Sequence, residues 1–567
     1  MCGIWAYLTK KDYIIKDPKL LYKSFNKIQP RGPDNSQFVS LGTNVILGFH
    51  RLAIMDTSDN GNQPFYYETD KYSFASICNG EIYNYKELIQ KYNIPVNSGS
   101  DCEILCYLAS IMSPETLCNE LDGVFAFIII RFDKTKNEYN AFIGRDITGV
   151  RPLYIGNVFD NNELIGYAFS SELKGLCDLH HITDIKQFKP ASYSQFSSNN
   201  LELHINEYFS IDNIKSIHHN EDEVILKIRE LLTKAVSKRL HADREMGALL
   251  SGGLDSSIVC ALLMQEGKKM YGDDFKLKTF CIGMEGATDR KYAQMTAEHI
   301  GSEHHYFQVT KEEFLKNFED TVKTTESPDI TTNRASTGQY SIGKKLKDKS
   351  DCIVVYVGEG ADELCQGYLY YLNQPTPEEG DIESREAIKN IHLYDSKRVD
   401  RNMSCHGLEV RVPFLDKEFV EYYFSISPEL RKPRNKTEKY LLRKTFSGTG
   451  LLPEEVIWRR KEAFSDGVSS ETDSWHSTLQ HRANALVSDE LFHKKALFFS
   501  KLEPVTKEAF MIRLMFLYYY NKDWFGQFMD TSGLNDDNYL ELIVSGLHEL
   551  NKQLHISERF HDIIPYY

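Results

Sequence analysis

A cysteine stands directly after the initiator methionine. If Met1 is removed, as is usual before a small side chain, Cys2 becomes the first residue and its own α-amino group is the nearest base. A free α-amino group has a pKa of about 8, so part of it is neutral at physiological pH and could accept the thiol proton. A lone cysteine is more often a small buried side chain, so this hypothesis needs partner residues.

Three further groups could complete a pocket that hydrolyses a free amino acid amide. Arg51 offers a planar donor fork suited to a carboxylate, and Asp101 could hold an ammonium group. Asn79 and Gly80 together could donate a side-chain amide and a backbone N–H to a tetrahedral oxyanion. Each also has a simpler interpretation: a surface ion pair for Arg51, a helix cap for Asp101 and a hairpin turn for Asn79-Gly80.

A second set of residues has the character of a phosphate site. The segment 251–257, SGGLDSS, follows the apolar run 246–250 and opens a helical pattern at 256–265. Small residues let backbone and hydroxyl donors approach phosphate, and a helix N-terminus adds a favourable partial charge. The segment lacks the lysine of a Walker A loop, but strand-SGGxDSS-helix is far more specific than GxGxxG.

Acidic and basic residues elsewhere could serve the same site. The loop 358–363 carries Asp362 after the strand-like run 352–357, at the carboxyl end where α/β sheets place ligands. Asp255 and Asp362 could supply oxygen ligands to Mg²⁺, although an acidic loop alone is usually only solvated. Lys461 could offset charge on a leaving phosphate, or belong to an exposed basic run.

Composition limits the class of protein. A chain of 567 residues implies more than one domain, and 41% hydrophobic with 26% charged residues is typical of a globular protein. The net charge of −15 disfavours nucleic acid and anionic membranes as partners. The first residues lack a signal-peptide pattern and the apolar run 124–130 is too short to span a bilayer, so we expect a cytoplasmic protein. The 11 cysteines show neither disulfide nor zinc spacing.

Periodicity predicts two kinds of domain. Residues 1–205 alternate short apolar runs with turns, which indicates antiparallel sheets, with helices at 20–28, 85–92 and 101–112. The strand-like runs are 2–8, 45–54, 73–83, 124–132, 141–145 and 164–171. The pattern loses its periodicity near 194–220, where we place the boundary. Residues 215–530 alternate strands at 246–250, 278–284 and 352–357 with helices such as 290–300, which favours a doubly wound parallel sheet.

The C-terminal part has a different character. From residue 436 the chain reads as mostly helical, and the strongly apolar segment 509–521 is expected to be buried. Residues 531–567 form a C-terminal extension whose role the sequence does not indicate.

Five N-terminal motifs in one order resemble the class II glutamine amidotransferases: CGI at 2–4, RGPD at 31–34, HRLAI at 50–54, NGE at 79–81 and LDG at 121–123. The resemblance implies an N-terminal-nucleophile αββα sandwich with Cys2 as nucleophile and Asn79 and Gly80 as oxyanion hole. It also implies glutamine binding by these two residues and by five others: Arg51, Leu52, Ile54, Glu81 and Asp101.

The second half resembles another family. The loop 251–257 is similar to the pyrophosphate loop of ATP pyrophosphatases, which leave an adenylate, and the segments 406–416 and 461–467 look like asparagine synthetase signatures. Near the aspartyl adenylate the resemblance implies Glu359 and Lys461 as catalytic groups, with Asp395 and Arg398, and it implies magnesium at Asp255 and Asp362. It implies these nucleotide-binding residues: Leu250, Ser251, Gly252, Gly253, Asp255, Ser256, Ile282, Val357 and Gly358.

The activity implied is glutamine-dependent amidation of aspartate at the expense of ATP. Glutamine, aspartate and ATP would be the partners, a homodimer is possible, and ammonia would need a largely apolar internal passage. Two alternatives stay open: a synthetase of the β-lactam-forming kind, disfavoured by Cys2, and a non-catalytic scaffold. The scaffold is suggested by Val357 and Ala361, which stand where the family usually has serine; each lost hydroxyl contact could weaken ATP binding by about 1 kcal/mol.

Overall fold

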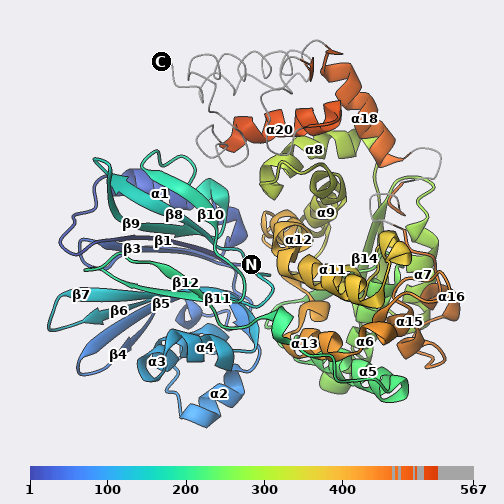
Figure 1. Cartoon of the computed structure of the whole chain (residues 1–567), viewed down its shortest axis with the longest axis horizontal. Helices are drawn as coiled ribbons and strands as arrows, with labels where there is room; N and C mark the ends of the chain where they lie inside the picture. The colour runs from blue at the N-terminus through green and yellow to red at the C-terminus, as the bar shows by residue number, and fades with distance from the viewer. Residues whose placement is uncertain (463–466, 470–473, 490–491, 494–503, 521–567) are drawn as a thin grey trace.

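The first domain is a pair of antiparallel sheets between helices. The computed structural model describes residues 1–462, 467–469, 474–489, 492–493 and 504–520. Figure 1 shows the two sheets stacked between α1 (Pro18–Asn26) on one side and α2 (Tyr85–Tyr92), α3 (Ile104–Ile111) and α4 (Pro114–Glu120) on the other. One sheet has the order β10 (Ile182–Gln187), β8 (Tyr154–Asp160), β9 (Glu163–Ser170), β1 (Gly3–Thr9), β3 (Val45–Arg51), β2 (Asn35–Ser40). The other has the order β12 (His204–Glu207), β11 (Ser192–Ser197), β7 (Glu138–Arg145), β6 (Gly123–Asp133), β5 (Tyr72–Ile82), β4 (Phe65–Glu68).

The strand β1 shows why these segments read as continuous apolar runs. Ile4, Ala6 and Leu8 face the core between the two sheets, whereas Trp5 and Tyr7 pack toward the core that includes α1. Every residue of β1 is buried, because each face of its sheet is covered. The αββα sandwich and its antiparallel sheets are therefore confirmed, and the fold leaves Cys2 at the amino end of a central strand.

The second domain is built on a parallel sheet, as predicted. Its order is β15 (Glu303–Gln308), β14 (Lys278–Gly283), β13 (Met246–Leu249), β16 (Val354–Tyr356), β17 (Glu409–Arg411). The order reverses at β13, since β14 lies on one side of it and β16 on the other. In such sheets ligands bind outside the carboxyl ends of the strands at this switch point. The two loops that leave there are 250–253, which leads into α6 (Leu254–Tyr271), and 357–360, which leads into α10 (Ala361–Leu364).

Helices cover the sheet and complete the domain. The longer ones, besides α6, are α5 (Glu221–Ser237), α7 (Asp289–Ile300), α8 (Lys311–Thr325), α9 (Ile330–Lys349), α11 (Pro377–Asn390), α12 (Asp395–Ser404) and α13 (Lys417–Ser425). The short helix α15 (Tyr440–Phe446) lies against α5. No helix within the described part of the chain combines the length and apolar character needed to cross a bilayer.

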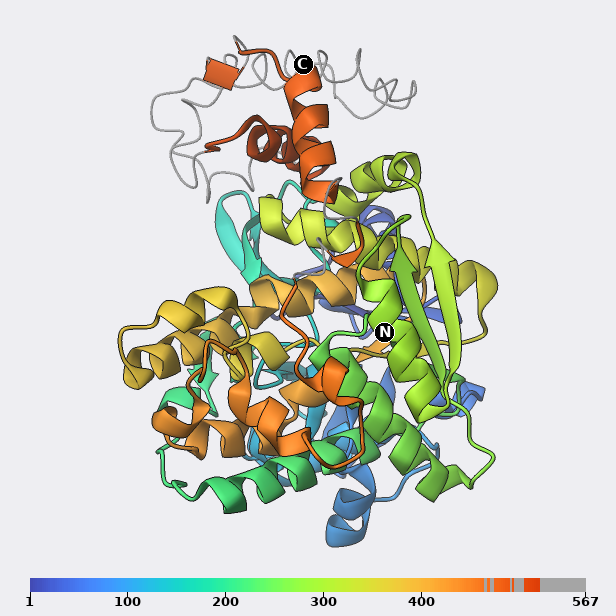
Figure 2. The ribbon, with the colours of Figure 1, turned by 90° about the vertical axis from the view of Figure 1, so that its right-hand side faces the viewer.

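The last described helices form a separate layer. Figure 2 shows α18 (Trp475–Leu486) and α20 (Lys507–Tyr520), coloured orange to red, at the top of the molecule. Phe510, Ile512 and Phe516 of α20 are fully buried, which confirms the burial predicted for the described part of 509–521. Residues 531–567 and residues 463–466 of the predicted signature lie outside the described residues.

The segment 194–220, which was expected to lack regular structure, contains strands. Strands β11 and β12 continue the second sheet of the first domain as far as Glu207, just past the predicted domain end at 205. Burial in β11 alternates strictly, with Ser192, Ser194 and Phe196 inward. Two of these three inward residues are serines, so the strand carries little hydrophobic signal. The division into 1–205 and 215–530 stays a prediction.

Candidate active sites

Cys2 lies at the junction of the two domains. It precedes β1, and its Sγ lies 3.6 Å from the carbonyl oxygen of Leu52, just after the paired strand β3. Met1 is 1% exposed, and its terminal nitrogen donates to the carbonyl oxygen of Leu408 in the second domain, at 3.2 Å. Ile54 is also buried, and its carbonyl oxygen accepts a hydrogen bond from the Asp243 N–H. The nucleophile predicted from sequence therefore faces the other catalytic domain.

The surroundings of Cys2 favour neutral groups. Burial raises the pKa of the Cys2 thiol to about 11, although the nearby terminal amine acts in the opposite direction. Burial also lowers the pKa of the Met1 amine to about 5. The Met1 amine is therefore largely neutral at physiological pH.

Asn79 and Gly80 lie inside β5, so the hairpin interpretation of this dipeptide is wrong. Both the nitrogen and the oxygen of the Asn79 side-chain amide are buried with no hydrogen-bond partner among the described residues. Buried polar atoms are rarely left unpaired without a functional or structural reason. A Cβ on Gly80 would lie 2.5 Å from the Val124 carbonyl oxygen, so close strand packing requires glycine there. The free amide fits an oxyanion donor.

Arg51 is turned toward a loop of its own domain. Its Nη1 donates to the carbonyl oxygen of Ser58 at 2.6 Å and to the Asn62 side chain at 2.9 Å, and its Nη2 donates to carbonyl oxygens of Met55 and Asp56. These acceptors are neutral, so no carboxylate of the described residues neutralises the guanidinium in this arrangement. A substrate carboxylate would have to share the Arg51 guanidinium with these acceptors or displace them.

Glu81 and Asp101 are both buried near the end of β5. Asp101 accepts a hydrogen bond from the Ile82 N–H at 2.6 Å instead of capping the following helix, so the capping interpretation is wrong. Burial raises the pKa of Asp101 to about 6. Glu81 lies 3.2 Å from Nη2 of Arg411, which belongs to β17 of the second domain. Glu81 is thus paired across the domain junction, a contact that its motif gave no reason to expect.

The phosphate loop has the predicted strand-turn-helix form. Leu250 donates its N–H to the Phe280 carbonyl oxygen at the end of the sheet, and the buried Ile282 lies on β14. Gly252 has a φ of +75°, and a Cβ there would lie 2.3 Å from the Ala293 nitrogen. Only glycine meets both requirements.

The rest of the loop is held by its own hydroxyls. Ser251 Oγ lies 3.1 Å from Ser256 Oγ and accepts from the Gly253 N–H at 3.2 Å. Gly358 approaches the loop so closely that a Cβ there would lie 2.9 Å from both Asp255 Cβ and the Ser256 nitrogen. The loops after β13 and β16 therefore form one continuous rim.

Asp255 and Asp362 converge on one cation. The Nζ atom of Lys439 lies 2.8 and 2.6 Å from the two Asp255 oxygens and 2.7 Å from Asp362 Oδ1. Lys461 approaches the other Asp362 oxygen at 2.5 Å. The predicted pairing of these two carboxylates and the nearness of Lys461 agree with this geometry. Lys439 was missed because it stands in the polar stretch 435–439, which has the composition of an ordinary loop.

The pKa values of the two carboxylates are shifted in opposite directions by this arrangement. Burial alone would raise the pKa of Asp362, but attraction to Lys439 and Lys461 holds it below its ordinary value. Burial and repulsion from Asp362 raise the pKa of Asp255 despite the same lysine. Two hard oxygen donors that already share a cation suit Mg²⁺, so the donor set fits the metal expected with ATP.

A cavity of about 140 Å³ adjoins the phosphate loop and gathers most of the other predicted residues. Glu359 accepts a hydrogen bond from Gln339 at 2.6 Å, and burial raises its pKa to about 6. Asp395 and Arg398 form an ion pair of 2.5 Å at the start of α12. Predicted residues lining this cavity are Ser251, Asp255, Ser256, Val357, Gly358, Glu359, Asp362, Asp395 and Arg398.

The cavity also has lining residues outside the predicted set, and it shows where the two departures from the family lie. Gln339 and Tyr368 also line the cavity, and Tyr368 donates to Glu363; neither stands in a motif that marks it. Val357 lines the cavity, whereas Ala361 is fully buried and packs in the hydrophobic core. Only the first replacement therefore places an apolar side chain where a hydroxyl would face a ligand.

Buried ion pairs join the two domains beside these sites. Arg31, from the RGPD motif, donates to the Cys2 carbonyl oxygen at 2.9 Å and to both oxygens of Asp400 on α12 at 2.8 and 3.0 Å. It also contacts Glu172 at 2.8 Å, and these three charged side chains are at most 3% exposed. Arg31 thus links the main chain of the nucleophile directly to α12, the helix that carries Asp395 and Arg398.

Comparisons with known proteins agree with this two-part architecture. The family profile described as glutamine amidotransferase domain matches residues 1–220, and the profile described as asparagine synthase matches residues 227–383 and 381–511. An asparagine synthetase [glutamine-hydrolyzing] from Cricetulus griseus is 40% identical, covering 92% of this chain and 95% of the relative. The proteins of the same name from Gallus gallus and Homo sapiens are 39% and 38% identical, covering 92% and 94% of this chain and 94% and 97% of the relatives. Taken with the two sites, these matches show that the chain belongs to the glutamine-hydrolysing asparagine synthetase family.

Proposed function

We propose that the chain converts L-aspartate, L-glutamine, ATP and water into L-asparagine, L-glutamate, AMP and diphosphate. The observation that carries this proposal is the pairing of a thiol at the domain junction with a phosphate loop whose two carboxylates share one cation. The first site suits amide hydrolysis and the second suits activation of a carboxylate by ATP. Their union in one chain accounts for a nitrogen transfer.

In the first domain, Cys2 attacks the side-chain amide of glutamine once Met1 has been removed. The thiol proton passes to the α-amino group, ammonia leaves, and water then hydrolyses the glutamyl thioester to glutamate. The Asn79 amide and the Gly80 N–H stabilise the oxyanion. Arg51 and Asp101 bind the α-carboxylate and α-ammonium of glutamine, with Leu52, Ile54 and Glu81 completing the pocket.

In the second domain, the aspartate side-chain carboxylate attacks the α-phosphate of ATP, which gives β-aspartyl-AMP and diphosphate. Ser251, Gly252, Gly253 and Ser256 contribute loop donors to the phosphates, and Leu250, Ile282, Val357 and Gly358 border the nucleotide. Lys439 and Lys461 offset charge on the departing diphosphate. Arg398 pairs with a substrate carboxylate and Asp395 with its ammonium, next to Glu359.

Asp255 and Asp362 would hold Mg²⁺, which supplies charge neutralisation to the polyphosphate when bound. In the present arrangement the Lys439 ammonium lies between these two carboxylates and offsets their charge. Glu359, with its pKa near 6, can accept a proton from attacking ammonia at neutral pH.

Ammonia must travel from Cys2 to the adenylate without mixing with bulk water, where it would be protonated. We expected a largely apolar passage, and that passage stays a prediction. The junction beside Cys2 is rich in buried charge: Arg151 lies 3.6 Å from Glu409, and Arg411 lies 2.9 Å from Glu409 and 3.2 Å from Glu81.

A Cys2→Ala variant tests the division of labour. It is expected to lose glutamine-dependent asparagine formation while it keeps formation from ammonium chloride, because only the first domain uses the thiol. A Cys177→Ala variant is the matched control, since Cys177 is a half-buried cysteine of the same domain outside the site, and it should keep both activities. Loss of both activities in Cys2→Ala would contradict the proposal.

The reaction also separates the alternatives. Diphosphate release that requires aspartate, with asparagine as product, distinguishes this synthetase from a ring-forming relative and from a non-catalytic scaffold. We further propose a cytoplasmic protein that acts on small molecules without nucleic acid or membrane partners. A homodimer is the assembly to test, by light scattering of the purified full chain.

A further inference from the structure

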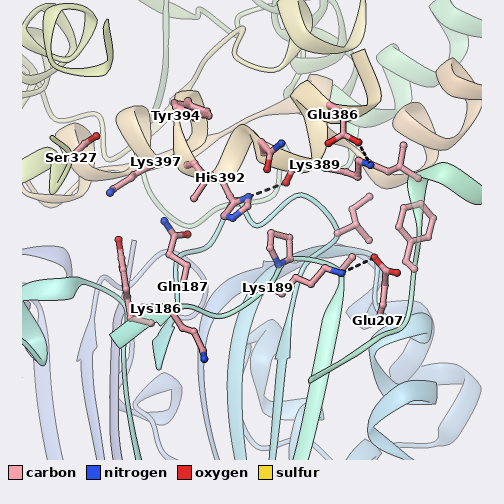
Figure 3. Close-up of a pocket in the computed structure, with 18 of the residues that line it drawn as sticks. Lys186, Gln187, Lys189, Glu207, Ser327, Glu386, Lys389, His392, Tyr394 and Lys397 are labelled. Carbon is pink, nitrogen blue, oxygen red and sulfur yellow. Dashed lines mark hydrogen bonds and ion pairs between the residues drawn. The ribbon is translucent and has the colours of Figure 1, made fainter. Parts of the chain in front are cut away.

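A further cavity lies between the two domains, distinct from the cavity beside the phosphate loop. Its volume is about 750 Å³, within the range of small-molecule sites. Figure 3 shows Gln187 and Lys189 of the first domain facing His392, Lys389 and Lys397 of the second. The walls come from the segments 186–191 and 207–212 on one side and 326–329 and 386–397 on the other.

Lys397 is the cation of this cavity that lacks an acidic partner. Its ammonium donates to the backbone carbonyl oxygen of Glu326, and none of the described carboxylates forms an ion pair with it. Burial and repulsion from Arg401 lower the pKa of Lys397 to about 7, although attraction to Glu326 and Asp329 acts in the opposite direction. An anion bound beside Lys397 would favour the charged form of this amine and accept a hydrogen bond from it.

The acids at the same end are already used within the protein. Glu326 accepts from the N–H groups of Leu173 and Lys174 at 3.0 and 3.1 Å and lies 3.1 Å from Nε of Arg401. Asp329 accepts from the Thr332 N–H at 2.6 Å as the cap of α9. Neither carboxylate is therefore free to turn toward Lys397 without breaking these bonds.

The other lysines around the cavity are paired. Lys389 lies 2.9 Å from Asp212 and 2.5 Å from Glu386, and Lys189 lies 3.3 Å from Glu207. The cavity thus has one available positive charge among several acidic side chains. A dianion such as phosphate would be repelled by those acids, whereas a single carboxylate matches the one cation.

Apolar groups complete the lining. Ile147, Pro190, Phe209, Leu393 and Tyr394 border the cavity. We infer that this interdomain cavity binds a small organic monocarboxylate, with its carboxylate on Lys397 and its apolar body against these side chains. Lys397 and Arg398 are neighbours on α12, so the ligand would lie one residue along the helix from the synthetase cavity.

The probe we choose is phenylacetate, which has one carboxylate and an apolar ring but no α-ammonium group. Titration of the full chain, followed by saturation-transfer NMR of the ligand, is expected to give a Kd on the order of 1 mM. Phenylacetamide, its neutral counterpart, should bind at least about tenfold more weakly, because a charge-assisted bond is lost. Inorganic phosphate should not compete.

Two substitutions locate the binding. Lys397→Gln is expected to weaken phenylacetate binding about tenfold or more. Lys389→Gln, which removes a paired lysine of the same cavity, should change the Kd by less than about twofold. Leu393→Trp fills the cavity without changing its charge and should also abolish binding, so the test does not depend on the folding of one variant.

The opposite results would overturn the inference. They are no binding of phenylacetate to the wild-type chain at about 20 mM, equal binding by Lys397→Gln and wild type, equal binding of the amide, or displacement by phosphate. Loss of binding in Lys389→Gln to the same degree as in Lys397→Gln would show that the anion is held by general positive charge instead of by Lys397.

Discussion

Replacing Lys439 with methionine tests the cation position at the phosphate loop. The Lys439 side chain is 1% exposed and bridges Asp255 and Asp362, whose side chains are 15% and 18% exposed. Removing one partner of a buried ion pair typically costs about 3–5 kcal/mol, because the remaining charges stay uncompensated. Lys461 still contacts Asp362 in the variant, so the lower end of that range is the expected loss.

The helix that begins directly after Lys439 provides a matched control. Lys444 of α15 pairs with Glu221 at 2.6 Å, but its side chain is 39% exposed. Lys444→Met removes the same charge from a solvent-screened pair and should cost about 0.2–1 kcal/mol. For a domain of this size about 3 kcal/mol corresponds to a fall in Tm of roughly 6–12 °C, against at most about 4 °C for the control.

The assay is thermal unfolding of the full chain with and without Mg²⁺. In Lys439→Met the two carboxylates are left facing each other, so Mg²⁺ should bind between them and restore part of the lost Tm. The loss should also be larger at pH 8 than at pH 5, because burial and repulsion from Asp362 raise the pKa of Asp255, and protonation of Asp255 at low pH relieves the repulsion. Equal Tm values for the two variants, or no difference in their response to Mg²⁺, would refute the reasoning.

Three further predictions follow from other parts of the molecule. Asn79→Ala should lower glutaminase kcat by about 10²–10³-fold and leave ammonia-dependent synthesis unchanged, as steady-state assays with each nitrogen donor would show. Glu359→Gln should remove an acid limb near pH 6 from the pH profile of ammonia-dependent synthesis. Burial raises the pKa of Glu359 to about 6, and only its carboxylate form can accept a proton. An unchanged profile would exclude this role. Asp400→Asn should flatten the loss of stability between about pH 4 and 2 in acid unfolding. Burial would raise the pKa of Asp400, but Arg31 and its hydrogen bonds lower it to about 2, so the stability it contributes is present above its ordinary pKa and lost below.

Local motifs allowed the fold class and much of each site to be predicted. The strand-turn-helix geometry at Gly252 follows from sequence, because a positive φ and close approach both demand glycine at that step. The antiparallel and parallel sheets followed from the spacing of apolar runs. Short or polar strands such as β11 and β17 were not predicted, because they bury few apolar side chains that a sequence pattern could reveal.

Contacts between distant parts of the chain could not be predicted. Lys439 reaches Asp255 across 184 positions, and Arg411 reaches Glu81 from another domain. Such pairs depend on how the elements pack, and a charged residue in a polar stretch looks the same whether it is solvated or buried. Asp101 illustrates the reverse error, because its local capping pattern was overridden by a bond to the Ile82 N–H in a neighbouring strand.

The buried ion pairs that fasten Arg31 to Asp400 and Arg411 to Glu81 also bear on protein engineering. Chimaeras that join the amidotransferase half of one relative to the synthetase half of another inherit only one side of each pair. A mismatched graft would leave a desolvated charge at the seam, whereas a graft that exchanges both partners together should keep the halves in register.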